Sequence, residues 1–355
     1  MKIGIFALAG VPFHANSLLE RALGGTETGV IKLAESLYKL GHQVVVLTNH
    51  PNPPPSEPLY LKHSAIPHLG ELDVLIAVRN WLTAITYPKA KIKCLWTGDN
   101  HDQPVSFGIG DNRVIAGIDQ LLVVSNWHKQ TFCDNSGFPE SKTFVLKNGI
   151  DPSRFEIDSK KHPKRLIYSS APFRGLKLMP EIFEKILSKH PDAEFKVFSG
   201  ETLYPLDSFS IKEYQLCKER LSKLKNCIVS EPITQVELAK EMKAASILAY
   251  PNTFEETSCI TAIEAMAAGC VPITSSLGAL PETIADAGCL IADKPGTVEF
   301  IENFVEKICY LFENKNELDK LAIAAMKRSK ELTWEKSAVN LTQKLEELLA
   351  EKLGK

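Results

Sequence analysis

Short runs of apolar residues alternate along this chain with longer segments in which apolar residues recur every three or four positions. The short runs predict buried strands, which in the first half lie at residues 3–9, 43–48, 74–78, 92–96, 120–124 and 144–151. The longer segments predict helices at residues 28–40, near Trp81 and at 126–132. Strands and helices that alternate in this way are typical of a parallel sheet covered by helices.

The same alternation restarts after residues 151–165, a charged segment with few apolar residues that is typical of an interdomain linker. Strands are predicted at 166–170, 194–198, 227–229, 247–251, 270–275 and 289–291, and helices at 176–188, 216–225, 235–245 and 281–285. The last segment predicts an amphipathic helix whose apolar side carries Trp334, Ala338, Leu341, Leu345, Leu348 and Leu349. The two halves therefore predict two similar α/β domains.

Size and charge agree with two globular domains and exclude several other classes of protein. The 355 residues exceed the usual size of one domain, and 44% apolar with 24% charged residues is far from the composition of disordered chains. A net charge of −2 offers no basic face for nucleic acid. No apolar run reaches the roughly 18 residues of a membrane span. The apolar opening could be a short signal peptide, but the glycine turn and helix that follow it favour a first strand.

The eight cysteines include no C-x-x-C pair, and most lie among apolar residues. We therefore expect free, buried thiols and no zinc site. Such thiols are typical of a reducing compartment. The expected location is the cytoplasm, with peripheral contact to the inner face of the membrane as an open alternative.

Residues 254–269, F-E-E-T-S-C-I-T-A-I-E-A-M-A-A-G, carry the strongest functional signal of the chain. A predicted strand precedes them, and a helix begins within them and ends at Gly269. The loop therefore lies at the carboxyl end of a parallel strand, where α/β sheets bind ligands, and the helix amino terminus suits phosphate. Glu256 and Glu264 can each accept hydrogen bonds from sugar hydroxyls. A diphosphate between two sugars fits this arrangement better than the alternative of two solvated glutamates on an ordinary helix.

Other loops add to this picture or exclude other sites. Gly24 and Gly25 precede a predicted helix and would let the backbone approach a ligand closely. Residues 108–113 fail the G-x-G-x-x-G fingerprint of dinucleotide sites, and the chain contains no P-loop. It also contains no D-x-D pair that could hold a divalent cation against a diphosphate.

Together these motifs resemble a retaining, GT-B-fold glycosyltransferase of family 4, also called glycosyl transferases group 1. The resemblance rests above all on the E-x7-E unit with the A-x-x-x-G-C-V-P-I that overlaps it. It also rests on Gly24-Gly25-x-Glu27, V-S-N-W at 124–127, K-N-G-I-D at 147–151 and R-G at 174–175. The final W-E-K-S-A helix resembles the family's carboxyl-terminal helix, which crosses back onto the first domain.

The fold that the resemblance implies is two facing Rossmann-like domains of the α/β class. Residues 1–160 are expected to form the amino-terminal domain on the acceptor side. Residues 161–333 are expected to form the carboxyl-terminal domain that binds the nucleotide-sugar donor. Residues 334–355 are expected to form the helix that packs back on the amino-terminal domain.

The resemblance also assigns roles to residues of the E-x7-E unit. Glu256 is expected to accept hydrogen bonds from the donor hexose, and Glu264 from the ribose hydroxyls of the nucleotide. The backbone N–H groups around Cys259, Ile260 and Thr261 are expected to meet the hexose and the β-phosphate.

Arg174 stands where family members carry a lysine that clamps the diphosphate, and an arginine can do so with a fork of N–H donors. The arginine that the family carries five residues earlier is Ser169 here. The clamp is therefore expected to hold a single cation unless Lys177 or Arg165 reaches it.

A polar loop at residues 97–102, T-G-D-N-H-D, is expected to contact donor or acceptor hydroxyls. One alignment with the family places its sugar-contacting histidine at Gly98, followed by Asp99. Another places it at His101, followed by Asp102. We favour Asp99 and His101 as the contacts.

The predicted catalytic residues are Glu256, Arg174, Asp99 and His101. The predicted donor-binding residues are Gly24, Gly25, Ser169, Lys177, Ser199, Gly200, Thr257, Ser258, Cys259, Ile260, Thr261 and Glu264. No metal ligand is predicted, since the chain has no D-x-D pair. No cofactor is predicted either, because a UDP-sugar would be the donor substrate.

The expected reaction moves a hexose, with UDP-glucose as the favoured donor, to a hydroxyl of a saccharide or lipid-linked acceptor. The anomeric configuration is expected to be retained. A GDP-sugar transferase and a sugar-nucleotide epimerase of the same architecture remain alternatives, as does a sugar-nucleotide binding protein without activity. The missing glycine fingerprint disfavours an NAD-dependent oxidoreductase. The acceptor, the linkage and the oligomeric state are not predicted.

Overall fold

The computed structural model describes residues 1–201 and 207–354. It divides the chain into two compact units: Met1–Leu18, Leu23–Gly149 and Leu332–Lys355 form the first, and Leu19–Ala22 and Ile150–Glu331 form the second. The main change from the first unit to the second falls after Gly149, whereas the sequence analysis puts the boundary after residue 160. Residues 202–206 of the predicted second domain and residue 355 of the predicted last helix lie outside the described residues.

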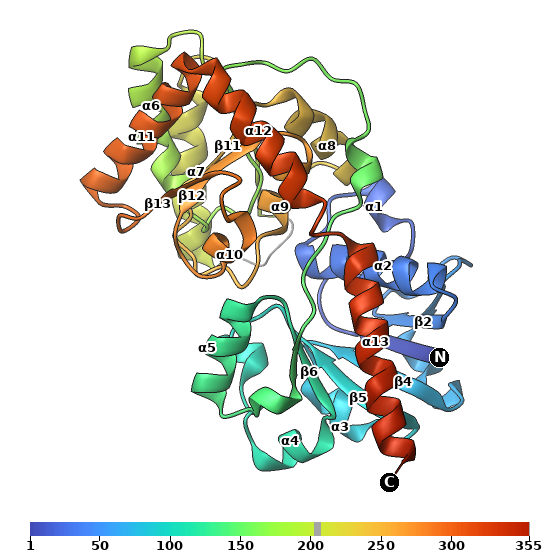
Figure 1. The fold of residues 1–355 in the computed structure, drawn as a ribbon. Coiled ribbons are helices and arrows are strands. Elements are labelled where there is room, and N and C mark those ends of the chain that lie inside the picture. Colours follow the sequence, from blue (N-terminus) through green and yellow to red (C-terminus); the bar gives the residue numbers. More distant parts are fainter. Residues whose placement is uncertain (202–206, 355) are drawn as a thin grey trace. The chain divides into compact units, whose positions relative to one another are not determined.

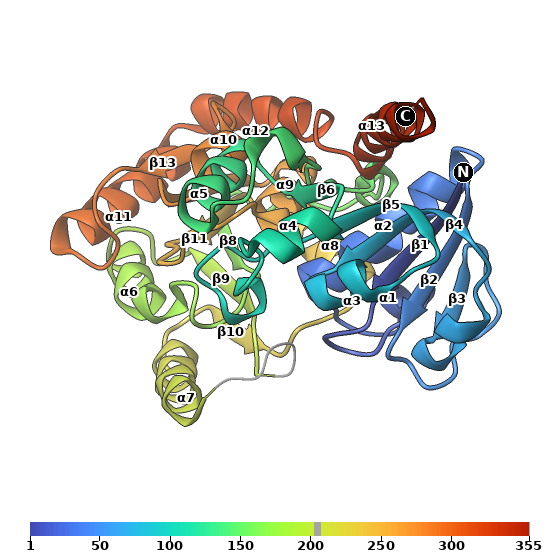
Figure 2. The same ribbon diagram turned by 90° about the horizontal axis from the view of Figure 1, so that it is seen from below.

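The first unit contains a seven-stranded parallel sheet with the strand order β3-β2-β1-β4-β5-β6-β7 (Figure 1). Its strands are β1 Lys2–Ala7, β2 Gln43–Thr48, β3 Leu59–Lys62, β4 Leu72–Val78, β5 Ala90–Trp96, β6 Gln120–Val123 and β7 Thr143–Val145. Its helices are α2 Gly25–Lys39, α3 Trp81–Thr86, α4 Asn112–Gly117, α5 Asn126–Ser136 and α13 Trp334–Leu353, and the short α1 Ser17–Glu20 is shared with the second unit. In Figure 2, β3 lies at the edge of this sheet beside β2.

The carboxyl-terminal helix α13 packs on the first unit, next to α2 and β5 (Figure 1). The buried ring of Trp334 meets the ring of Trp96 edge-on, with centroids 6.5 Å apart. The Ser337 hydroxyl donates to the Lys147 carbonyl at 2.6 Å. A Cβ on Gly149 would lie 2.3 Å from the backbone nitrogen of Trp334, so only glycine allows this turn to approach the start of the helix.

The second unit contains a six-stranded parallel sheet with the order β10-β9-β8-β11-β12-β13. Its strands are β8 Arg165–Tyr168, β9 Glu194–Phe198, β10 Cys227–Ser230, β11 Ile247–Tyr250, β12 Val271–Ser275 and β13 Cys289–Ile291. Its helices are α6 Met179–Lys189, α7 Ser208–Ser222, α8 Gln235–Ala244, α9 Ile260–Ala267, α10 Leu280–Ile284, α11 Val298–Glu313 and α12 Lys315–Ser329. Short 3-10 helices lie at His63–His68, Pro104–Ser106 and Glu140–Lys142 in the first unit and at Pro152–Phe155 and Leu176–Leu178 in the second.

Both sheets have the topology of a Rossmann-like domain. In each, the chain builds outward from a first strand, β1 or β8, and then returns to the other side of that strand with β4 or β11. The carboxyl ends of the two strands that flank such a return are where open α/β sheets bind ligands. In the second unit, the loops that follow β8 and β11 carry Arg174 and Glu256. The predicted fold class, two Rossmann-like α/β domains, is confirmed.

Candidate functional site

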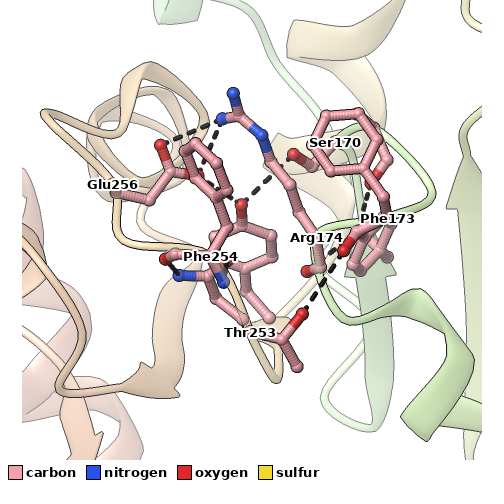
Figure 3. Close-up of polar contacts among 10 residues, drawn as sticks. Ser170, Phe173, Arg174, Thr253, Phe254 and Glu256 are labelled. Carbon is pink, nitrogen blue, oxygen red and sulfur yellow. Dashed lines mark hydrogen bonds and ion pairs between the residues drawn. The ribbon is translucent and has the colours of Figure 1, made fainter. Parts of the chain in front are cut away.

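The loops that follow β8 and β11 bring Arg174 and Glu256 together in the second unit (Figure 3). Nη1 of Arg174 lies 2.8 Å from Oε1 and 2.9 Å from Oε2 of Glu256. The two loops can approach because Gly175 has a φ of +94°, and a Cβ there would lie only 2.0 Å from the Pro251 carbonyl oxygen. The Glu256 side chain is 3% exposed and that of Arg174 26%, so the pair lies at the boundary between interior and solvent.

Tyr250, the last residue of β11, completes the surroundings of the Glu256 carboxylate. Its hydroxyl donates to Oε1 of Glu256 at 2.6 Å and lies 3.3 Å from the Ser170 hydroxyl. Burial raises the pKa of the Tyr250 phenol well above its usual value, so the hydroxyl keeps its proton and remains a donor. The Ser199 hydroxyl in turn donates to the Ser170 carbonyl at 2.6 Å. Tyr250 is a site residue that the sequence analysis did not identify.

Helix α9 begins directly after the Glu256 loop, with Cys259 as its N-cap. Burial raises the pKa of the Cys259 thiol well above its usual value, and a neutral thiol is only a weak hydrogen-bond acceptor. The Cys259 side chain makes no capping hydrogen bond, so the start of the helix keeps capacity for an anion. Among the described residues, the buried hydroxyl oxygen of Thr261 has no hydrogen-bond partner. An unsatisfied buried hydroxyl is unusual and points to a ligand or water at this helix end.

Glu264 lies further along α9, and its side chain is 5% exposed. Nη1 of Arg154, from the 3-10 helix Pro152–Phe155, lies 3.0 Å from Oε1 of Glu264. Nη2 of Arg154 also donates to the carbonyl of Gln235 at 3.1 Å. Sequence reasoning missed Arg154 because it lies in the charged segment that was assigned to a linker.

Several other predicted donor-binding residues lie on nearby segments of the second unit. Ser169 directly follows β8, and Thr257 and Ser258 belong to the loop between Glu256 and α9. Ile260 is the first residue of α9. Gly200 directly follows Ser199 after β9, and a Cβ there would lie 2.2 Å from Oε2 of Glu231.

The two cations that might have joined Arg174 have acidic partners elsewhere in the second unit. The Lys177 amine lies 3.2 Å from Oε1 of Glu213 on α7. The Arg165 guanidinium lies 2.7 Å from Oε2 of Glu194 on β9. Arg174 is therefore the cation that contacts Glu256 in the described residues of this unit.

The remaining predicted residues belong to the first unit. Gly24 is the N-cap of α2 and Gly25 its first residue, so the helix begins earlier than the predicted Thr28. This difference arises because the Gly24 carbonyl already accepts a hydrogen bond from the Thr28 N–H at 3.0 Å, which closes the first helical turn.

Asp99 is the most strongly connected residue of the polar loop at 97–102. Its carboxylate receives two hydrogen bonds from Arg79, at 2.6 Å from Nε and 3.1 Å from Nη2. Its carbonyl lies 3.1 Å from Nε2 of the buried His128. His101 instead bonds Asn100, with its backbone N–H 2.9 Å and its Nδ1 3.2 Å from Oδ1. The sequence analysis missed Arg79. In the structure its backbone has a φ of +64°, which is unusual for a residue with a side chain of this size.

Neither a metal-ligand cluster nor a membrane-spanning helix occurs in residues 1–201 and 207–354. No group of three or more His, Cys, Asp and Glu side chains could hold a metal ion in that part of the chain. No helix there is long and apolar enough to cross a membrane. The eight cysteines are free, with Cys94, Cys217, Cys259, Cys270 and Cys309 buried and Cys133, Cys227 and Cys289 half-buried.

Comparison with known proteins places these features in a family context. The family model described as "Glycosyl transferases group 1" matches residues 150–328. A chain of the phosphatidylinositol N-acetylglucosaminyltransferase from Arabidopsis thaliana is 21% identical over 316 residues, which cover 76% of this chain and 68% of that protein. A D-inositol 3-phosphate glycosyltransferase from Streptomyces avermitilis is 25% identical over 239 residues, which cover 62% of this chain and 50% of that protein.

Solved structures match nearly the whole chain. A glycosyltransferase from Rickettsia africae aligns with a TM-score of 0.74 and 16% identity, covering 98% of this chain and 99% of that one. Alr3699/HepE from Anabaena, in complex with UDP and glucose, aligns with a TM-score of 0.75 and 14% identity, covering 98% and 100%. At these identities the likeness concerns the fold, which is the GT-B fold of glycosyltransferases.

Proposed function

We propose that the reaction of this chain, which belongs to the glycosyl transferases group 1 family, is the transfer of a hexose from a UDP-sugar. As a member of that family the chain is a glycosyltransferase that uses a nucleotide sugar. UDP-glucose is the first candidate donor, and a hydroxyl of a saccharide or lipid-linked acceptor is the expected recipient. The observation that carries the proposal is the contact between Arg174 and Glu256, directly before the amino terminus of α9.

The donor diphosphate would bind at the first turn of α9. The N–H groups of that turn and the partly positive helix end favour a phosphate. The Thr261 hydroxyl supplies a further donor that has no partner among the described residues. The Arg174 guanidinium would bind the phosphate that leaves and stabilise its charge as the glycosidic bond breaks.

The two glutamates of α9 and its preceding loop would bind the two sugars of the donor. Glu256 would accept hydrogen bonds from the hexose, and Oε2 is its more available atom because Oε1 accepts from Tyr250 as well as from Arg174, whereas Oε2 contacts Arg174. Glu264 would accept from the ribose hydroxyls. Arg154 holds the Glu264 carboxylate in a fixed orientation for that role.

Transfer would retain the anomeric configuration because the acceptor hydroxyl attacks the anomeric carbon on the same face of the sugar from which the diphosphate departs. The bond between the anomeric carbon and the acceptor oxygen forms as the bond to the phosphate oxygen breaks. The acceptor proton passes to the departing phosphate oxygen. One observation supports this route over a covalent enzyme intermediate: the Tyr250 hydroxyl donates a hydrogen bond to the Glu256 carboxylate, which makes that carboxylate a weaker nucleophile.

A thermal-shift screen with UDP-, GDP-, ADP- and dTDP-sugars tests the donor, because a ligand that binds the folded state raises the unfolding midpoint. We expect UDP-glucose to raise it most. The stabilising donor is then incubated with mono- and disaccharides, inositol phosphates and lipid-linked saccharides, and the product's anomeric configuration is read by NMR. Conversion of the sugar nucleotide to its epimer without any acceptor would instead identify an epimerase. A product of inverted configuration would overturn the proposed route.

A further inference from the structure

Two phenylalanines from different loops flank the guanidinium of Arg174 (Figure 3). The Cζ atom of Arg174 lies 5.7 Å from the ring centroid of Phe173 and 4.8 Å from that of Phe254. The two ring centroids are 6.2 Å apart, and the ring planes are inclined by 75°. The two distances from Cζ to the ring centroids are within the range of cation–π contacts. We call Phe173 and Phe254 the aromatic pair.

The aromatic pair and Glu256 make different kinds of contact with the same guanidinium. A cation–π contact places the cation over the face of an aromatic ring, whereas hydrogen bonds are made by the N–H groups at the edge of the guanidinium. Nη1 at that edge contacts both Glu256 oxygens. An entering phosphate would therefore compete with Glu256 for the edge and would leave the contacts with the aromatic pair in place.

The loops that carry the aromatic pair are also tied to each other. The Thr253 hydroxyl donates to the Phe173 carbonyl at 3.3 Å. The Tyr168 hydroxyl donates to the carbonyls of Ala171 and Arg174, at 2.8 and 3.3 Å. The backbone on both sides of the guanidinium is thus held independently of any ligand.

This chain has particular need of such support because, within residues 1–201 and 207–354, a single cation contacts Glu256. Ser169 stands where the resemblance places a second arginine, and Lys177 and Arg165 contact Glu213 and Glu194. A lone exposed arginine would sample many rotamers and lose side-chain entropy on binding. A guanidinium that is already held in its binding plane avoids most of that loss.

We propose that Phe173 and Phe254 are positioning residues that hold the Arg174 guanidinium in the plane in which it binds the donor diphosphate. This inference rests on the proposed function. When the diphosphate enters, the guanidinium edge turns from Glu256 to the phosphate, and the carboxylate becomes available to the hexose. The aromatic pair keeps the guanidinium in place during this exchange of partners.

Calorimetric titration of UDP and UMP tests the inference, because UMP lacks the β-phosphate that Arg174 would bind. Phe173→Leu and Phe254→Leu keep apolar volume but remove the aromatic faces. We expect each variant to bind UDP about 3- to 10-fold more weakly, with an unchanged affinity for UMP. Phe254→Tyr, which keeps an aromatic face, should restore UDP affinity to within about 2-fold. Phe209→Leu, at a 75% exposed phenylalanine of α7, is the matched control and should bind both nucleotides as the wild type does.

The possible outcomes separate this inference from the proposed function. One outcome is that the wild type binds UDP no better than UMP, and every other nucleoside diphosphate no better than the matching monophosphate. In that case the chain has no diphosphate site here, and both proposals fail. If the wild type prefers UDP and the leucine variants keep that preference in full, only the aromatic pair is overturned. Equal weakening of UDP and UMP, or a lowered thermal midpoint without ligand, would mean that the rings merely support the loops, which also overturns it.

Discussion

The guanidinium of Arg154 lies 3.0 Å from the carboxylate of Glu264, although the two residues are 110 positions apart. Their side chains are only 13% and 5% exposed. The 3-10 helix Pro152–Phe155 thus contacts the middle of α9, the helix whose first turn is expected to bind phosphate. The segment that looks like a simple connection in the sequence therefore helps to orient one of the two motif glutamates.

Removing Arg154 should destabilise the protein because it leaves the Glu264 carboxylate buried without its charged partner. For Arg154→Met we expect the free energy of unfolding to fall by about 3 kcal/mol, the lower end for buried ion pairs. Urea unfolding at pH 7 measures it. Lys223→Met breaks an exposed pair in the same unit, with side chains 71% and 61% exposed, and should cost under about 1 kcal/mol. Equal losses in the two variants would show that Glu264 does not depend on Arg154.

Replacing Arg174 should mainly slow turnover. Arg174→Ala removes the cation that is proposed to stabilise the departing diphosphate, so we expect kcat to fall by roughly two orders of magnitude. UDP binding should weaken as well. Steady-state rates and UDP titration of the same preparation measure both effects. Unchanged activity would assign leaving-group stabilisation to the α9 backbone or to Lys177.

The strands were the most predictable part of the fold because buried parallel strands are continuous apolar runs. The predicted ranges 43–48, 194–198 and 289–291 coincide with β2, β9 and β13. Strand β3, Leu59–Lys62, was missed because it pairs on one side only and just one of its residues, Tyr60, is buried. Its apolar run at residues 59–61 is shorter than that of a central strand such as β4.

The helices were predicted less well than the strands. Helices α11 and α12 follow each other through Asn314, with no glycine or proline between them, and neither was predicted. Helix α7 begins at Ser208 rather than 216 because the Asp207 side chain accepts hydrogen bonds from the N–H groups of Phe209 and Ser210. Strand β7, Thr143–Val145, begins one residue earlier than the predicted strand at 144–151 and ends six residues earlier.

Local patterns predicted only those parts of the site that are close in sequence, and Arg174 was predicted from the family resemblance. The E-x7-E spacing identified Glu256 and Glu264, and the fold places both on or next to α9. Arg154 and Tyr250 went unrecognised because their roles depend on tertiary contacts that no local pattern contains. Asp99 lies in a loop that two alignments read differently, and its contacts with Arg79 and His128 emerge only from the folded first unit.

Activity should survive the removal of divalent cations. The sequence contains no D-x-D pair that could hold Mg²⁺ or Mn²⁺ against a diphosphate, and Arg174 is proposed to supply the positive charge instead. We expect the initial rate to change by less than about 2-fold in excess EDTA, since no metal-dependent step is proposed. Loss of activity that Mn²⁺ restores would contradict the proposed chemistry.

Stability should fall as the pH drops below neutral because of His128. The pKa of His128 is lowered to about 4, mainly by burial and to a smaller extent by nearby His101, although the hydrogen bond with the Asp99 carbonyl acts in the opposite direction. The unfolded chain, with a histidine pKa near 6.5, binds more protons than the folded chain between pH 4 and 6.5. The contribution of neutral His128 to the free energy of unfolding is therefore complete above about pH 6.5. It decreases toward pH 4 and is about 2 kcal/mol smaller at pH 5.

Urea unfolding at pH 7 and pH 5 tests the role of His128. His128→Gln should show a smaller difference between the two pH values than the wild type, because glutamine does not titrate. The exposed His63 provides the control, and His63→Gln should keep the full difference. An undiminished difference in His128→Gln would assign the pH dependence to other groups.

The variants Glu264→Gln and Glu256→Gln should differ in which kinetic parameter changes. Glu264 is proposed to hold the ribose in both the ground state and the transition state, so Glu264→Gln should raise the donor KM more than it lowers kcat. Glu256 is proposed to contact the hexose, where geometry and charge change during transfer, so Glu256→Gln should strongly reduce kcat. Its affinity for free UDP should stay nearly intact, because UDP carries no hexose. Steady-state rates and UDP calorimetry measure both effects, with the exposed neighbour Glu255→Gln as the matched control. If Glu256→Gln abolishes UDP binding while Glu264→Gln leaves it unchanged, the two roles are reversed.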